Sequence, residues 1–190
     1  MDRGSQRGFS LLELLIVLFV VMVIASLVTL NVNSGGQDVQ LYGKVRSLAD
    51  ISSYALDEAQ MAGVDMGLLL ERVADGVDPV YRYSWRERRE QGWRIPERDE
   101  DIYGLKEFPP DIELRLVLED LPVQELKLAS DAKDLVPQVI FYSSGETTPG
   151  FIELRQTGSG DLLWMVEWDL LGRFELLPRG EVIEEDFDGE

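Results

Sequence analysis

One long apolar segment near the N-terminus constrains this chain more than any other feature. From Phe9 to Leu30 the sequence reads FSLLELLIVLFVVMVIASLVTL, and Glu13 is its one ionisable residue. A helix of that length extends about 33 Å at a rise of about 1.5 Å per residue. This is enough to cross a hydrocarbon core of about 30 Å. The segment therefore predicts a transmembrane helix over residues 9–30.

The polar sequence MDRGSQRG precedes this apolar segment. A secretory signal carries its small-residue cleavage site after the apolar run, so the predicted helix is expected to stay in the mature protein. Arg3 and Arg7 stand before the helix, and the bias of Lys and Arg toward the cytoplasmic side places the N-terminus in the cytoplasm. We therefore expect a single-pass inner-membrane protein with its C-terminal part in the periplasm.

Glu13 lies about one turn inside the apolar segment. An ionised carboxylate at the centre of a membrane helix costs about 2.5 to 3.5 kcal/mol on insertion scales. Two interpretations stay open. Either the side chain reaches the nearby interface, where this cost falls, or it pairs with an ammonium group inside a helix bundle.

The rest of the chain is strongly acidic and lacks two reactive residue types. Asp and Glu total 36 against 18 Lys and Arg, and residues 1–30 are neutral overall, so the net charge of −18 lies beyond Leu30. Such a surface repels phosphate backbones, which argues against nucleic acid as a partner. The chain has no Cys and no His, which excludes disulfides, Ser-His-Asp catalysis and Cys-His catalysis.

The sequence GFSLLE at residues 8–13, followed by the apolar helix, resembles the class III leader of type IV pilins and pseudopilins. In that family a prepilin peptidase cleaves after the Gly and methylates the new N-terminal Phe. The resemblance implies cleavage between Gly8 and Phe9, loss of the cytoplasmic leader (residues 1–8) and N-methylation of Phe9. Glu13 then takes the position whose carboxylate is thought to pair with the N-terminal amine of a neighbouring subunit.

A helical continuation is predicted over residues 31–63. Residues 31–36 combine poor helix formers with two glycines, so the long helix is expected to weaken or bend there. Apolar residues then recur at spacings typical of one helix face, and Gly63 is a suitable stop. The members of this face are Leu41, Val45, Leu48, Ala55, Ala59 and Ala62.

Residues 64–180, the β-rich head, show the period of two that is typical of half-buried strands. Residues 86–107 lack clean periodicity and predict a long surface excursion. A helix followed by antiparallel strands predicts an α+β fold with a long N-terminal helix packed on antiparallel β-sheets, as in pilins. The predicted strands cover residues 81–85, 112–118, 139–143, 151–156, 162–168 and 173–177, separated by turns at Gly145, 158–161 and Gly172.

The head also resembles the H-type pseudopilin domain. The match includes the aromatic strand at residues 81–83, Gly92 with Trp93, Phe108 with Pro109, and IFYSSGETTP at residues 140–149. The resemblance implies a minor pseudopilin of the type II secretion system, a structural subunit near the pseudopilus tip that supports export of folded proteins. It implies as partners other minor and major pseudopilins, the prepilin peptidase and the inner-membrane secretion platform, in addition to membrane lipid.

Three alternatives stay open. They are a J-type minor pseudopilin, a minor pilin of a type IV pilus that primes the pilus or takes up DNA, and a signal-anchored periplasmic enzyme. The acidic head argues against DNA capture, which needs clustered cations. The missing His and Cys, together with Glu13, argue against an enzyme.

The acidic clusters and the tryptophans each allow a functional and a structural interpretation. Residues 99–101 and the acidic tail (181–190, with Glu184, Glu185, Asp186 and Asp188) offer oxygen ligands, but neither has the spacing of a dedicated calcium loop. A solvated surface is the simpler interpretation. For Trp85, Trp93, Trp164 and Trp168, core packing is favoured where they lie on alternating strands. No catalytic, cofactor-binding or metal-ligating residue is assigned, and no cofactor is expected.

Overall fold

The computed structural model describes residues 11–75, 78–97, 99–119, 121, 126 and 136–181, without the side chains of residues 24–38, 75 and 78. The chain divides into two units, residues 1–42 and 43–190. The predicted leader, Phe9 and the acidic tail beyond Glu181 lie outside the described residues. The elements are α1 (Leu11–Ala62), β1 (Met66–Asp75), β2 (Asp78–Arg89), β3 (Gly92–Arg94), α2 (Glu100–Tyr103), β4 (Lys106–Glu107), β5 (Ile112–Leu118), β6 (Val139–Phe141), β7 (Gly150–Gln156), β8 (Leu162–Trp168) and β9 (Phe174–Pro178).

The N-terminal unit is helical from Leu11 onward. Its described side chains from Leu11 to Val23 are all exposed, and all are apolar except Glu13. A helix that is apolar on every side is typical of one that lipid or other helices surround. The side chains of α1 are described up to Val23 and again from Val39, and within these described residues no helix has an apolar stretch long enough to cross a membrane.

α1 ends for a local reason. It is helical through residues 31–36, so the two glycines there do not end it, and the expected weakening stays a prediction. Gly63 has a φ of 65°, in the left-handed region that glycine adopts without steric cost. The Val64 N–H donates to the Ala59 carbonyl at 3.1 Å. This backbone bond satisfies one of the carbonyls that the end of a helix leaves without a partner.

In the C-terminal unit, one face of α1 is buried. Val45, Leu48, Ala55 and Ala59 are at most 1% exposed, as the helical spacing predicts. Ala62 was assigned to the same face and is exposed. Ala62 continues this face by its spacing from Ala59, but it is not buried because the last turn of α1, residues 60–62, is exposed throughout.

The first sheet has the strand order β3-β2-β1-β6, with β4 also paired to β2. β1 and β2 form an antiparallel hairpin in which Leu68 pairs with Trp85. Directly opposite residues share one face of a sheet, and both of these are at most 2% exposed. The Trp85 Nε1–H donates to the Ser52 Oγ of α1 at 3.3 Å. This sheet therefore packs its buried face on the helix.

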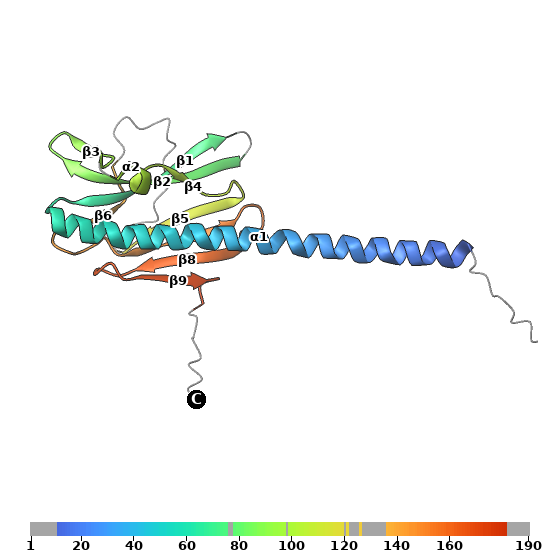
Figure 1. The fold of residues 1–190 in the computed structure, drawn as a ribbon. Coiled ribbons are helices and arrows are strands. Elements are labelled where there is room, and N and C mark those ends of the chain that lie inside the picture. Colours follow the sequence, from blue (N-terminus) through green and yellow to red (C-terminus); the bar gives the residue numbers. More distant parts are fainter. Residues whose placement is uncertain are drawn as a thin grey trace, which may run out of the picture. The chain divides into compact units, whose positions relative to one another are not determined.

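The second sheet is antiparallel and has the strand order β5-β7-β8-β9. Leu116, Ile152 and Val166 lie side by side on three of its strands, and each is 0% exposed. Gly172, in the β8–β9 turn, has a φ of 70° and lies so close to α1 that a Cβ atom would clash with the Leu56 side chain. Both sheets therefore contact α1, and Figure 1 shows β1 to β3 above its C-terminal half and β8 and β9 below it.

The α+β prediction is confirmed, and one segment corrects it. Residues 86–107 are not a surface excursion, because they contain the end of β2, then β3, α2 and β4. Tyr103 of α2 is 1% exposed. Its ring stacks on Tyr54 with 6.1 Å between centroids and meets Trp85 edge-on at 6.3 Å. Burial of this aromatic side chain anchors the segment to the core.

Candidate functional site

Of the predicted processing and assembly residues, the structure describes only Glu13. Gly8 and Phe9 lie outside the described residues, so their geometry stays a prediction. Glu13 lies in the first turn of α1 and is exposed.

The surroundings of Glu13 are apolar. Leu11, Leu12, Leu14 and Leu15 are between 59% and 79% exposed. An ionised carboxylate among such side chains is stable in water or beside a cation, and costly once lipid or other helices cover the surface. The predicted assembly contact of Glu13 therefore falls on an exposed apolar surface of α1, and its partner stays a prediction.

The second sheet carries a groove on the face opposite to its buried row. Its cavity measures about 640 Å³. Val117, Phe151, Glu167 and Glu175 line it as one row across four strands, each opposite the next. The whole lining comprises six apolar residues, four carboxylates, Gly150 and Arg173, and neither His nor Cys occurs in the chain. Without His or Cys, this lining cannot supply a Ser-His-Asp triad or a Cys-His pair.

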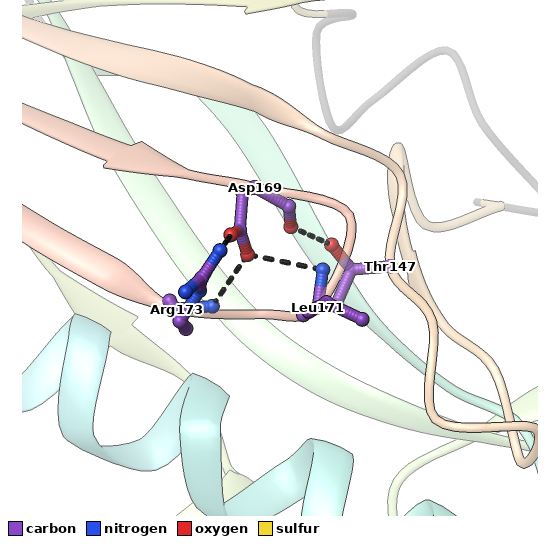
Figure 2. A network of polar contacts seen from close by, with 4 residues as sticks. All are labelled: Thr147, Asp169, Leu171 and Arg173. Atoms are coloured by element: carbon purple, nitrogen blue, oxygen red, sulfur yellow. Dashed lines mark hydrogen bonds and ion pairs between the residues drawn. The ribbon is translucent and has the colours of Figure 1, made fainter.

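The β8–β9 turn at the edge of this groove is held by a network around Asp169 (Figure 2). The Asp169 carboxylate accepts the backbone N–H groups of Leu171 and Arg173, each at 3.0 Å, and the Arg173 Nε–H at 2.7 Å. The Thr147 hydroxyl donates to the Asp169 carbonyl at 2.9 Å. Hydrogen bonds from the backbone and side chain of Arg173 hold the pKa of Asp169 below its ordinary value.

The same network gives a structural role to the segment at residues 140–149. Thr147 belongs to the predicted strand-and-turn segment IFYSSGETTP at residues 140–149, and it is 1% exposed. Its backbone N–H also donates to the Leu170 carbonyl at 2.8 Å. The motif therefore joins the β6 region to the β8–β9 turn. The same turn places Gly172 against α1.

Because the pKa of Asp169 is depressed, its contribution to stability should depend on pH. The contribution is present above the ordinary value of 3.8 and is lost as the pH falls through the lower folded-state pKa. We expect Asp169→Asn to lower the melting temperature at neutral pH, with the difference from wild type shrinking in strong acid. Thermal unfolding followed by circular dichroism at several pH values measures this. Asp161→Asn in the β7–β8 turn is the matched control, and a difference that is constant across pH would contradict the charge-based account.

The structure shows where the four tryptophans and the acidic residues 99–101 lie. Trp85 and Trp168 are core residues, 0% and 2% exposed, whereas Trp93 and Trp164 are partly exposed. Residues 99–101 surround the start of α2. In the described ranges, no three or more Asp, Glu, His or Cys residues gather so as to hold a metal ion. The tail carboxylates 184–188 lie outside those ranges.

Comparisons with known proteins match both parts of the chain. The prokaryotic N-terminal methylation motif matches residues 3–29. The family of type II transport protein GspH matches residues 44–172, more than half of the chain.

Relatives of this chain span nearly its whole length. The type II secretion system protein H of Aeromonas hydrophila is 27% identical over 188 residues, which cover 95% of this chain and 98% of the relative. The protein of the same description from Pseudomonas aeruginosa is 29% identical over 160 residues, with 81% and 86% covered. The crystal structure of the minor pseudopilin EpsH from the type II secretion system of Vibrio cholerae has a similar fold. Its TM-score is 0.58 at 22% identity, over 76% of this chain and 98% of that one.

Proposed function

This chain belongs to the family of type II transport protein GspH, and on that premise we propose that it is a minor pseudopilin of a type II protein secretion system. It acts as a structural subunit at or near the tip of the pseudopilus and supports export of folded proteins across the outer membrane. The observation that carries this proposal is the match of one chain to both the methylation motif and the GspH family. Relatives described as secretion system protein H support it over nearly the full length.

Processing and topology follow from the same premise. The methylation motif covers residues 3–29, and we propose cleavage between Gly8 and Phe9 with methylation of the new N-terminus. Family membership implies an anchor in the inner membrane. The apolar segment 9–30 is long enough for a single pass, and Arg3 and Arg7 favour a cytoplasmic N-terminus. The head then lies in the periplasm.

The assembly contact that we propose is an ion pair at Glu13. After cleavage, the mature chain begins with a protonated amine at Phe9, four residues before Glu13. In a helix bundle this amine, from the same or an adjacent subunit, comes within reach of the carboxylate and forms a charge-assisted hydrogen bond. The partners are thus other minor and major pseudopilins, while the prepilin peptidase and the secretion platform act on the chain in the membrane.

Two observations favour secretion over the alternative functions. The net charge of −18 lies beyond Leu30, and an acidic head is unfavourable for capture of DNA. The 640 Å³ groove is lined by apolar side chains, carboxylates and Arg173 in a chain without His or Cys, which favours a structural role over an enzymatic one.

Deletion of the gene in its native bacterium tests this proposal. We expect the extracellular level of type II substrates to fall toward the level of a secretion-null strain and to return when the wild-type gene is supplied. Because the chain has no cysteine, Asp57→Cys on the exposed face of α1 gives a unique site for crosslinking to other pseudopilins. Unchanged secretion combined with loss of pili or of DNA uptake would contradict the proposal and favour a type IV pilus pilin.

A further inference from the structure

A second cavity, separate from the groove on the second sheet, opens beside the C-terminal end of α1. Its volume is about 280 Å³. We define this Tyr103 pocket by Glu58 of α1, Glu97 and Asp99 of the segment before α2, and Tyr103 of α2. Met66 and Pro96 form part of its apolar wall.

The Tyr103 hydroxyl is the unusual group in the pocket. Tyr103 is 1% exposed, and its hydroxyl has no hydrogen-bond partner among the residues that the structure describes. Buried hydroxyl groups normally have a partner, because burial of an unpaired one is unfavourable. Burial, followed by the nearby Tyr54, Glu58 and Asp99, raises the pKa of Tyr103. The hydroxyl is therefore neutral and lies within the field of two carboxylates that line the same cavity.

The pocket has an excess of negative charge. Arg89 and a fourth carboxylate, Glu87, also line it. The Arg89 Nε–H donates to Glu87 Oε1 at 2.7 Å, and Glu97 adds an electrostatic attraction to Arg89. No ion pair between described residues involves Glu58, Glu97 or Asp99. Three carboxylates and an unpaired neutral hydroxyl therefore border one small cavity.

We propose that the Tyr103 pocket binds the guanidinium group of an arginine side chain from a neighbouring subunit of the pseudopilus. A guanidinium group has five N–H donors in one plane, so it reaches carboxylates on separate elements and the Tyr103 hydroxyl together. The apolar wall at Met66 and Pro96 accommodates the aliphatic part of the side chain. The choice of a neighbouring subunit as the source rests on the proposed function.

The size and arrangement of the pocket favour a side chain over other cations. Sites for small molecules usually measure about 300 to 1,000 Å³, and 280 Å³ lies below that range. The described carboxylates do not gather in a group that suits a metal ion. An extended cation with several donors fits groups that stand apart, whereas a compact metal ion needs ligands at one point.

Binding is tested with the purified full-length chain in detergent micelles. The probe is the peptide acetyl-Gly-Arg-Gly-amide, and the neutral isostere with citrulline in place of arginine is the control ligand. We expect saturable binding of the arginine peptide by NMR or calorimetry, with at least tenfold weaker binding of the citrulline peptide. Equal binding of the two peptides, or no binding of either, would overturn the proposal.

Variants locate the binding in the pocket. Glu58→Gln and Tyr103→Phe keep the shape of each side chain, and each should weaken binding of the arginine peptide at least fivefold. Asp57→Asn changes an adjacent exposed carboxylate and should leave the affinity for the peptide unchanged. Melting temperatures no lower than that of the wild type show that the variants are folded. Arg98 lies outside the described residues, and if Arg98→Ala strengthened peptide binding, the occupant would be this chain's own arginine and the proposal would be wrong.

A photo-crosslinking residue at Ala62, which is exposed and lines the pocket without contributing a charge, identifies the source of the arginine in cells. A crosslink to another pseudopilin that is lost with Glu58→Gln supports the proposal, and a crosslink to an exported protein instead overturns it. Peptide binding does not depend on secretion. Absence of peptide binding would therefore contradict the pocket proposal but not the proposed function. Unchanged secretion after gene deletion would contradict the proposed function but not the affinity of the pocket for arginine.

Discussion

Glu13→Ala is expected to be cleaved and inserted normally, but to join the pseudopilus poorly and to lower secretion strongly. Removal of one partner of a desolvated ion pair costs about 3 to 5 kcal/mol, because the other charge is left without a partner. At about 1.4 kcal/mol per factor of ten, this corresponds to roughly two to four orders of magnitude in the assembly equilibrium. Alanine itself inserts in a membrane at least as well as glutamate.

The measurement combines crosslinking of Asp57→Cys to other pseudopilins with a secretion assay at matched expression. Leu14→Ala is the control, because it shortens an adjacent side chain of the same exposed apolar surface without removing a charge. If Glu13 only reaches the membrane interface, both variants will crosslink and secrete like wild type. That result would remove Glu13 from the assembly mechanism.

Gly8→Glu is expected to leave the leader attached and to abolish function. A protease that holds its substrate in an extended conformation approaches the backbone closely at the cleaved bond, and a bulky charged side chain obstructs that approach. The unprocessed chain keeps residues 1–8 in front of Phe9, so the amine that Glu13 needs does not form. We expect only precursor by mass spectrometry and secretion at the level of the deletion strain.

Gly4→Glu introduces the same side chain into the leader away from the cleavage site, and it should be processed like wild type. A normally trimmed Gly8→Glu chain would show that cleavage occurs elsewhere. An equal block in both variants would show that the charge of the leader, and not access to the cleaved bond, controls processing.

The strands of the second sheet were predictable because one face is buried and the other is not. In β5, Ile112, Leu114, Leu116 and Leu118 are buried and alternate with more exposed residues, so the period of two is visible in the sequence. The end of α1 was predictable for a different reason. Gly63 adopts a positive φ, and the residue type reflects that local requirement.

β1 could not be recognised from periodicity. Leu68, Leu69 and Leu70 follow one another and are all at most 2% exposed, so both faces of this strand are buried and alternation is lost. A short continuous apolar run does not distinguish a strand from a helix. α2, with four residues, is about one turn long, too short for any period. Its place in the core depends on one residue, Tyr103, packing on residues distant in sequence.

The candidate sites also differ in how far they could be predicted from the sequence. Gly8, Phe9 and Glu13 lie within a few residues of one another, so a motif and the cost of a charge in an apolar segment are enough to single them out. The Tyr103 pocket combines Glu58 with residues about 40 positions later. Nothing in the sequence pairs these residues, and the shortage of hydrogen-bond partners at Tyr103 is visible only once the chain has folded.

The central claim is that this chain is a processed pilin-type subunit, and the N-terminus of the protein isolated from membranes tests it most directly. Mass spectrometry of the wild-type protein from cells with active prepilin peptidase should give a chain that begins at Phe9 and carries one methyl group on its amine. The same cells without the peptidase should give the full precursor. A wild-type chain that retains Met1 in the presence of active peptidase would contradict the account.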